Sequence, residues 1–273
     1  MHVLRARSAA TALTAAAAAL TLAAGAATAA TAAPTPPPPP GSAHMGMGVA
    51  AHDGVGGLPP AAPRAVQTEG VDVSSHQGNV NWPALWSSGV KWAYVKATEG
   101  TTYKNPSFAQ QYNGSYNVGM IRGAYHFALP DNSSGAAQAA YFAGNGGGWS
   151  RDGRTLPGAL DIEWNPYGAQ CYGKTQAQMV AWIRDFLTTY RARTGRDAVL
   201  YTATSWWKTC TGNYAGFAAT NPLWVARYNT TVGELPAGWG TYTMWQYTST
   251  GPVVGDHNRF NGALDRVRAL ANG

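Results

Sequence analysis

The chain has 273 residues, of which 45% are hydrophobic, so it can bury one large core or two small ones. Lys and Arg total 19 and Asp and Glu total 13. Because Arg5, Arg7, Arg64 and Asp53 precede Glu69, the net charge from Glu69 onward is +4. This mild charge favours a polyanionic partner such as a bacterial wall. Without a basic run of five residues, it argues against a nucleic acid partner.

Residues 1–33 have the features of a secretory signal peptide. Arg5 and Arg7 form a charged start, an Ala/Thr/Leu stretch follows, and Ala-Thr-Ala runs near Ala29 and Ala32 suit signal peptidase. A membrane anchor is the alternative, but Ala and Thr are weakly apolar and Pro-Thr-Pro interrupts the run. No later segment is apolar enough to span a bilayer. We therefore expect a secreted, extracellular protein without a membrane contact in its mature form.

Residues 34–68 contain Pro36–Pro40 and many Gly and Ala residues. This composition predicts a segment that buries no core, either a linker or a removable pro-segment. The folded domain is expected over residues 69–273.

Strand-like runs alternate with helical segments along this domain. Alternation of this kind predicts an α/β fold with a mostly parallel sheet and right-handed crossovers. About eight strands favour a modified (β/α) TIM-like barrel with fewer helices than a regular barrel. A doubly wound open sheet is the alternative, although no Gly-rich nucleotide loop follows the first strand. The runs are Val71–Ser74, Val90–Ala97, Ile121–Ala128, Ala159–Trp164, Ala198–Thr202, Leu223–Tyr228, Tyr242–Thr248 and a weaker one after Asp256.

The clearest helix is predicted over residues 176–193. Thr175 and Gln178 fit a capping box at its start, and Gly195 fits its end. Its apolar residues recur at i, i+3, i+4, i+7, i+8 and i+11, which places them on one face. They are Met179, Trp182, Ile183, Phe186, Leu187 and Tyr190.

Acidic residues gather at the predicted strand ends, which form the active face of a β/α barrel. Asp72 and Glu99 lie at the ends of the first two strands, Asp161 and Glu163 at the end of the fourth, and Asp256 opens the last. Carboxylates brought together from separate strands repel one another. Such an arrangement costs stability unless a functional site uses it.

Asp161 and Glu163 form the strongest local pattern. Two residues apart on a strand, they project to the same side with Cα atoms about 6.6 Å apart, and Ile162 and Trp164 then face the surrounding helices. Close carboxyls push their pKa values apart, so one can remain protonated near neutral pH. Cleavage of a glycosidic bond needs such a proton donor beside a second group that meets the sugar carbon. A metal pair or a surface salt bridge is the alternative interpretation.

Aromatic and polar residues near the strand ends suit a sugar-binding cleft, since flat rings stack on the apolar faces of sugars. The chain has 11 Trp and 14 Tyr. Each of these residues could instead serve packing or a structural ion pair. The candidates for binding are Tyr125, Tyr201, Trp224, Tyr228, Trp245, Tyr247, Lys96, Arg227 and Gln246.

Other chemistries lack their usual patterns. His76, His126 and His257 lie on separate segments without an HxH or HxxxH spacing, and no GxSxG or phosphate-binding loop occurs. We therefore expect no metal and no cofactor. Cys171 and Cys210 do not fit a zinc site, and in a secreted chain such a pair suggests a disulfide, two buried thiols being the alternative.

Several segments together resemble one known family. From about Val71 to the C-terminus the chain is similar to lysozymes of glycoside hydrolase family 25, above all the secreted bacterial N,O-diacetylmuramidase type. The motifs occur in the family's order and are specific as a set. They are Gly70-Val-Asp-Val-Ser-Ser-His-Gln-Gly, Tyr94-Val-Lys-Ala-Thr-Glu-Gly, Arg122-Gly-Ala-Tyr-His-Phe, Leu160-Asp-Ile-Glu and Met244-Trp-Gln-Tyr.

The resemblance implies a monomeric β/α-barrel enzyme that cuts the β-1,4 bond between N-acetylmuramic acid and N-acetylglucosamine in peptidoglycan with retention. It implies that Glu163 is the general acid/base, and that Asp161 or the substrate acetamido group is the nucleophile. It matches Asp72 and Asp256 to the remaining site acids, and Cys171 and Cys210 to a disulfide. The loop before Asp256 looks shorter than usual, and His257 is atypical beside it. A non-catalytic wall-binding barrel and a chitinase-like enzyme are the alternatives, although only the end of the chitinase DxxDxDxE pattern is present.

Overall fold

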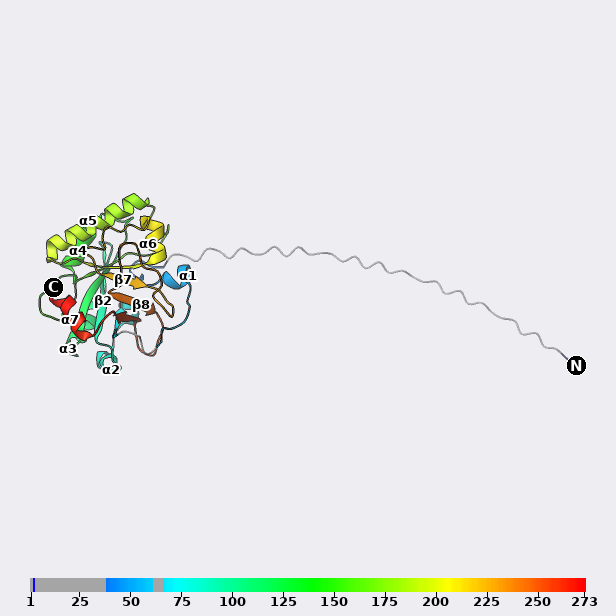
Figure 1. Ribbon diagram of the computed structural model, residues 1–273, viewed down its shortest axis with the longest axis horizontal. Coiled ribbons are helices and arrows are strands. Elements are labelled where there is room, and N and C mark those ends of the chain that lie inside the picture. The colour runs from blue at the N-terminus through cyan, green and yellow to red at the C-terminus, as the bar shows by residue number, and fades with distance from the viewer. Residues whose placement is uncertain (1, 3–37, 61–65) are drawn as a thin grey trace. The chain divides into compact units, whose positions relative to one another are not determined.

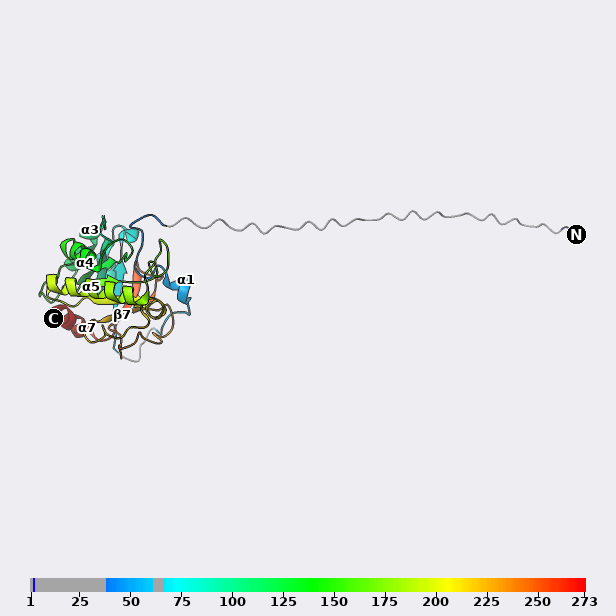
Figure 2. The same ribbon diagram turned by 90° about the horizontal axis from the view of Figure 1, so that it is seen from above.

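The computed structural model describes residues 2, 38–60 and 66–273 (Figures 1 and 2). The predicted signal peptide, apart from His2, lies outside these residues. Residues 37–273 form one compact unit. No helix of the described residues is both long enough and apolar enough to cross a membrane.

Eight strands close into the predicted barrel, in the order β1, β2, β4, β5, β6, β7, β8, β9, with β9 returning to β1. The pairs from β1 to β8 are parallel, whereas β9 is antiparallel to both neighbours. The barrel strands are β1 (Thr68–Val73), β2 (Trp92–Glu99), β4 (Ile121–Phe127), β5 (Ala159–Asp161), β6 (Val199–Ala203), β7 (Leu223–Ala226), β8 (Met244–Thr248) and β9 (Asp256–Phe260). The predicted α/β barrel is therefore confirmed, with its last strand reversed.

Helices cover the barrel unevenly. In both views α4 lies along α5, and α3 packs on β2 and β4. No described helix separates β7 from β8 or β8 from β9, so the chain has fewer helices than a regular barrel, as predicted. The helices are α1 (Val49–Asp53), α2 (Trp82–Ser87), α3 (Phe108–Asn117), α4 (Gly135–Gly144), α5 (Gln176–Thr194), α6 (Thr204–Thr211) and α7 (Leu264–Asn272); the short η1 (Ser75–Gln77) and β3 (Tyr103–Lys104) complete the fold.

Helix α5 has the predicted form. The Thr175 side chain accepts a hydrogen bond from the Gln178 backbone while the Gln178 side chain accepts one from the Thr175 backbone, and Gly195 ends the helix with φ 72°. All six residues of the predicted apolar face are buried. The amphipathic period alone therefore fixed which side of α5 faces the barrel.

Large aromatic rings fill the barrel interior. The ring centroids of Trp92 and Trp224 lie 6.0 Å apart, those of Tyr94 and Trp224 4.8 Å, and those of Trp92 and Phe260 6.4 Å. Gly70 makes room for this column, because a Cβ atom there would lie 2.1 Å from the Trp92 ring. The column closes the bottom of the barrel and leaves polar side chains at the carboxyl ends of the parallel strands.

Candidate active site

The acid pair predicted at the end of the fourth strand lies buried at the barrel mouth. β5 ends at Asp161, whose carbonyl accepts from Ala128 N at 2.9 Å, and Ile162 N donates to Tyr201 O at 3.0 Å, so ladder bonds hold the backbone on both sides. Asp161 is 0% exposed to solvent and Glu163 is 1% exposed. Neither Asp161 oxygen accepts a hydrogen bond from an N–H or a hydroxyl of the described residues.

A second acid pair comes from β1 and β9. Asp72 and Asp256 are direct partners in the antiparallel register, because β9 begins at the mouth where β1 ends. Gln246 joins them: its Nε2 donates to Asp72 Oδ2 at 2.9 Å and to Asp256 Oδ2 at 3.3 Å. Asn258 Nδ2 donates to the same Asp72 oxygen at 2.7 Å. The structure thus brings all four predicted acids to one mouth.

Burial shifts the titration of these acids upward. It raises the pKa of Asp72 to about 7, against the hydrogen bonds from Asn258 and Gln246. It raises the pKa of Glu163 to about 7, against a hydrogen bond from the Gly46 backbone. Four such groups cannot all ionise at neutral pH in so little water.

The remaining two acids shift further. Burial, followed by the charge of Glu163, raises the pKa of Asp161 well above its usual range. Burial, followed by the charge of Asp72, also raises the pKa of Asp256 well above its usual range. Some of these carboxyl groups therefore remain protonated at neutral pH, and a glycosidic oxygen could accept one of those protons.

Tyrosines line the inner wall above the aromatic column. Tyr201 Oη donates to Gln246 Oε1 at 2.6 Å, and Tyr228 Oη donates to the same atom at 3.1 Å. The Tyr125 hydroxyl is buried without a hydrogen-bond partner among the described residues. Each hydroxyl thus lies close to the acids, as expected for residues that would hold a sugar.

Lys96 and Glu99 form a buried ion pair at the end of β2. Lys96 Nζ lies 2.5 Å from Glu99 Oε2, and Tyr167 Oη donates to Glu99 Oε1 at 2.7 Å. Burial lowers the pKa of Lys96, and the charge of Glu99 opposes that shift. The predicted hydrogen-bond donor therefore belongs to the site, with a carboxylate partner that the sequence analysis left unassigned.

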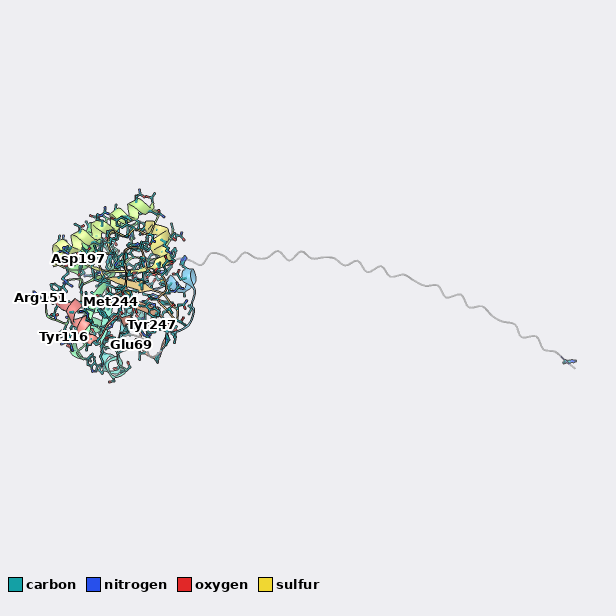
Figure 3. The ribbon with its side chains drawn as sticks, in the orientation of Figure 1. Glu69, Tyr116, Arg151, Asp197, Met244 and Tyr247 are labelled. Carbon is teal, nitrogen blue, oxygen red and sulfur yellow. A yellow bond between two sulfur atoms is a disulfide. The ribbon has the colours of Figure 1, made fainter. Side chains whose placement is uncertain are left out.

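Two predicted binding residues lie elsewhere. Trp245 points to the outer face of β8, where it packs with Leu223 and Val225 and its Nε1 donates to Arg227 O at 2.8 Å. Tyr247 also faces outward, and its hydroxyl donates to Glu69 Oε2 at 3.0 Å (Figure 3). Strand alternation explains both cases, because Gln246 between them points inward.

Trp224 and Arg227 occupy intermediate places. Trp224 faces inward but lies deep in the aromatic column, and its Nε1 donates to Asn258 Oδ1 at 2.8 Å. Arg227 follows β7 at the rim, beside a cavity of about 210 Å³. Trp224 therefore positions Asn258, which donates to Asp72. Of these two residues, Arg227 is the one that a ligand could reach.

Two residues of the mouth were missed by the sequence analysis. Asn258 lies two residues after Asp256 on the inner face, so the period of two could have identified it. Trp164 was expected to face the helices, but it lies at the mouth, where the His52 ring stacks on it with centroids 3.9 Å apart. β5 ends at Asp161, and alternation therefore no longer applies at Trp164.

The N-terminal segment, residues 38–60, reaches this mouth. Gly46 N donates to Glu163 Oε1 at 2.6 Å, and Gly48 N lies 3.5 Å from Glu163 Oε2. Ala43, Met45 and Val49 are at most 1% exposed. This differs from the expectation that the segment buries no core: its few apolar residues fill an existing hollow of the barrel instead of building a core of their own.

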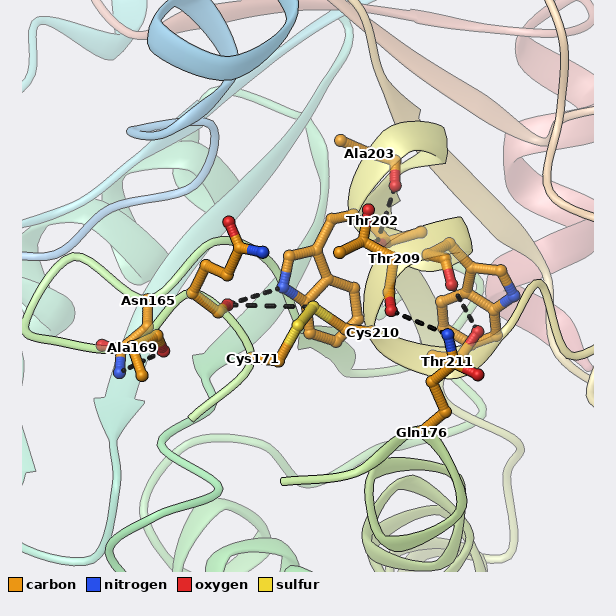
Figure 4. The surroundings of a disulfide bond; sticks show 12 residues. Asn165, Ala169, Cys171, Gln176, Thr202, Ala203, Thr209, Cys210 and Thr211 are labelled. Carbon is orange, nitrogen blue, oxygen red and sulfur yellow. Dashed lines mark hydrogen bonds between the residues drawn. A yellow bond between two sulfur atoms is a disulfide. The ribbon is translucent and has the colours of Figure 1, made fainter. Parts of the chain in front are cut away.

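The disulfide predicted from the cysteine pair is present (Figure 4). Cys171 and Cys210 are bonded, with Cα atoms 5.4 Å apart, and join the loop after β5 to α6. Gln176 Nε2 donates to Thr209 O at 3.1 Å beside it. The bridge therefore fixes the loop that carries Trp164 and Tyr167.

A metal centre finds no support in the described part of the chain, where no three His, Cys, Asp or Glu side chains are arranged to hold an ion. His126 is buried between Thr98 and Gln138, at 2.8 Å and 2.9 Å, and burial lowers its pKa to about 4. His257 Nε2 lies 3.2 Å from Val253 O on the outer side.

Comparison with known proteins agrees with this geometry. The model of glycosyl hydrolases family 25 matches residues 71–256, which include all four acids. The chain belongs to this family. It is 53% identical over 243 residues to lysozyme M1 of Streptomyces globisporus, covering 85% of this chain and 82% of that one.

Two further relatives are matched over nearly their whole length. An N,O-diacetylmuramidase of Chalaropsis sp is 48% identical over 209 residues, which are 75% of this chain and 99% of the relative. The solved muramidase of Acremonium alcalophilum has a TM-score of 0.75 and 57% identity, covering 76% of this chain and 99% of its own. As a family 25 member, this chain is a glycosidase, and about three quarters of it matches nearly the whole length of each of these two relatives.

Proposed function

We propose that this chain is a secreted muramidase that hydrolyses the β-1,4 bond between N-acetylmuramic acid and N-acetylglucosamine in peptidoglycan, with residues 69–273 as the catalytic domain. The observation that carries the proposal is the buried pair of Asp161 and Glu163, which the barrel brings to one mouth together with Asp72 and Asp256. The relatives named lysozyme, muramidase and N,O-diacetylmuramidase support the substrate.

Glu163 is assigned the general acid and base. With a pKa of about 7 it is partly protonated at neutral pH and can protonate the glycosidic oxygen as the bond to the sugar carbon breaks. The resulting carboxylate then takes a proton from the water that attacks the intermediate. Retention of configuration follows from the two successive displacements.

The substrate acetamido oxygen is our preferred nucleophile, with Asp161 orienting it. A carboxyl that burial and the neighbouring Glu163 keep protonated is a poor nucleophile. An Asp161 oxygen can accept a hydrogen bond from the acetamido N–H and so orient the acetamido oxygen, which bonds to the sugar carbon as the glycosidic oxygen leaves with the Glu163 proton; water then displaces the acetamido oxygen. This route is a known exception to the usual carboxylate nucleophile.

Tyr125, Tyr201, Tyr228, Lys96 and Gln246 are proposed to hold the sugars. Their polar atoms lie beside the acids, and the tyrosine rings add apolar surface for the sugar faces. The net charge of +4 from Glu69 onward supports approach to a polyanionic wall. We propose a monomer, since the four acids come from one chain.

The test compares Glu163→Gln with the parent in a chain that begins at Gln67, because the N-terminal segment contacts Glu163. Clearing of bacterial walls should fall roughly a hundred- to ten-thousand-fold, since Gln cannot donate that proton. Glu234→Gln, a matched change at a side chain that is 70% exposed, should clear walls normally.

The products discriminate the remaining possibilities. New reducing ends should be muramic acid, and N-acetylglucosamine ends would instead indicate a glucosaminidase. Equal clearing by Glu163→Gln and the parent would contradict the role of Glu163. Binding of walls without cleavage by the parent would favour the non-catalytic wall-binding barrel.

A further inference from the structure

The N-terminal segment lies across the barrel mouth and contacts the acids directly. Gly46 and Gly48 are 117 and 115 residues away from Glu163 in sequence, yet their backbone N–H groups point at its two oxygens. Tyr228 Oη also donates to Gly46 O at 3.2 Å. The glycosidic oxygen and its sugar would have to occupy this space beside Glu163.

The segment also takes the partners of the ion pair. Lys96 Nζ donates to Gly41 O at 3.1 Å and to Ala43 O, while Gly41 N donates to Glu99 Oε1 at 2.9 Å. Ala43 N lies within 3.1 Å of the Tyr167 hydroxyl. The polar groups that would recognise a sugar are therefore bonded to the backbone of this segment.

Two cavities flank the segment, one near each of its ends. One cavity of about 330 Å³ lies beside Pro38, Pro40 and Tyr167. The cavity of about 210 Å³ beside Arg227 includes Asp53. Neither reaches Asp161 or Glu163, so a glycan strand cannot cross the mouth while the segment is in place.

The fit depends on glycines that no other residue could replace. Gly46 has φ +80°, and a Cβ atom there would lie 2.2 Å from Tyr228 Oη and 2.4 Å from Gln246 Oε1. At Gly48 a Cβ atom would lie 2.7 Å from Trp164 Cβ. Buried Met45 and Val49 and the stacked ring of His52 complete the contact. A solvated linker would need none of these features.

We propose that the N-terminal segment is an autoinhibitory element that keeps the secreted chain latent by occupying the glycan cleft and bonding to Glu163. The inference rests on the proposed muramidase function. The backbone N–H groups of Gly46 and Gly48 occupy the two Glu163 oxygens, one of which must reach the glycosidic oxygen during catalysis.

In this proposal, latency ends when the segment is cut from the chain. The segment precedes β1 in the same chain, so it binds at the high effective concentration of a tethered ligand. Hydrolysis of one peptide bond between Pro60 and Thr68 by a protease would convert it into a free peptide that dilutes away. Activation therefore requires no rearrangement of the barrel.

The test uses the full chain with Gly46→Val, which should expel the segment without changing any barrel residue. Walls should be cleared at least about tenfold faster by the variant than by the wild type, because the competent fraction rises. Val55→Ala, at an exposed residue of the same segment, should remain as latent as the wild type. Hydrogen exchange at residues 43–49 should be slow in the wild type and in Val55→Ala and fast in Gly46→Val.

A second measurement keeps this test independent of the proposed function. Peptidoglycan fragments should bind Gly46→Val and quench its Trp fluorescence, at concentrations at least about tenfold below those needed for the wild type. Equal affinities, or wild-type clearing as fast as that of the variant, would overturn the autoinhibitory role. If the variant binds fragments more tightly but neither chain cuts walls, occlusion stands and the muramidase function fails.

Discussion

Replacing Asp72 by Asn should flatten the pH dependence of stability. The pKa of this carboxyl is about 7 in the fold, against an ordinary value of 3.8. The difference of about 3 units, at 1.36 kcal/mol for each, corresponds to about 4 kcal/mol of stability. Because the folded pKa is raised, this stability is fully present below about pH 4 and is lost as the pH rises through about 7.

The wild-type chain should therefore be more stable at pH 5 than at pH 8. The amide introduced by Asp72→Asn would be neutral at both values and would keep one oxygen that can accept from Asn258. Removal of the Asp72 charge also lowers the cost of ionising Asp256, because that charge helps to raise the pKa of Asp256. Both effects reduce the slope of the free energy of unfolding against pH.

Denaturant unfolding followed by circular dichroism at several pH values measures this slope. Asp265→Asn, at an exposed acid in the first turn of α7, is the control, and its slope should match the wild type within about 0.5 kcal/mol. An unchanged slope in Asp72→Asn, or a wild type that is no less stable at pH 8, would refute the reasoning from burial.

Two other predictions concern the scaffold. Replacing both Cys171 and Cys210 by Ala should lower the free energy of unfolding by about 4 kcal/mol, because the bridge closes a loop of 39 residues in the unfolded chain. Guanidinium unfolding measures this loss, and a midpoint equal to that of the oxidised wild type would contradict it. Thr175→Ala removes the capping box of α5 and should lower the free energy of unfolding, measured by thermal unfolding, by about 1 kcal/mol. Thr188→Ala, on the exposed side of the same helix, should lower it much less. Similar losses in the two variants would show that the cap is not the cause.

The elements of the barrel could be predicted because their signals are local. The six apolar residues of α5 follow the helical period, and Thr175 and Gly195 mark its ends. Strand positions followed from β-branched and aromatic runs, and the acids from their places at strand ends. The reversal of β9 has no local signal, since antiparallel pairing with β1 and β8 depends on how the barrel closes.

The lining of the mouth was predicted less well, although part of the signal was available. Alternation along β8 and β9 places Gln246 and Asn258 inward and Trp245 outward, and residue type alone did not reveal this. Trp164 could not be placed in this way, because β5 stops three residues before it.

The sequence by itself determined the α/β barrel, the disulfide pair and the acids Asp161 and Glu163, because each depends on a short pattern or on a family motif. Only the tertiary structure decided what covers those acids. The contacts of Gly46 with Glu163 and Tyr228 join residues 117 and 182 positions apart. A Pro-, Gly- and Ala-rich segment has no periodic pattern from which such contacts could be predicted. Its fit depends on the shape of a cleft that residues far away in the chain form.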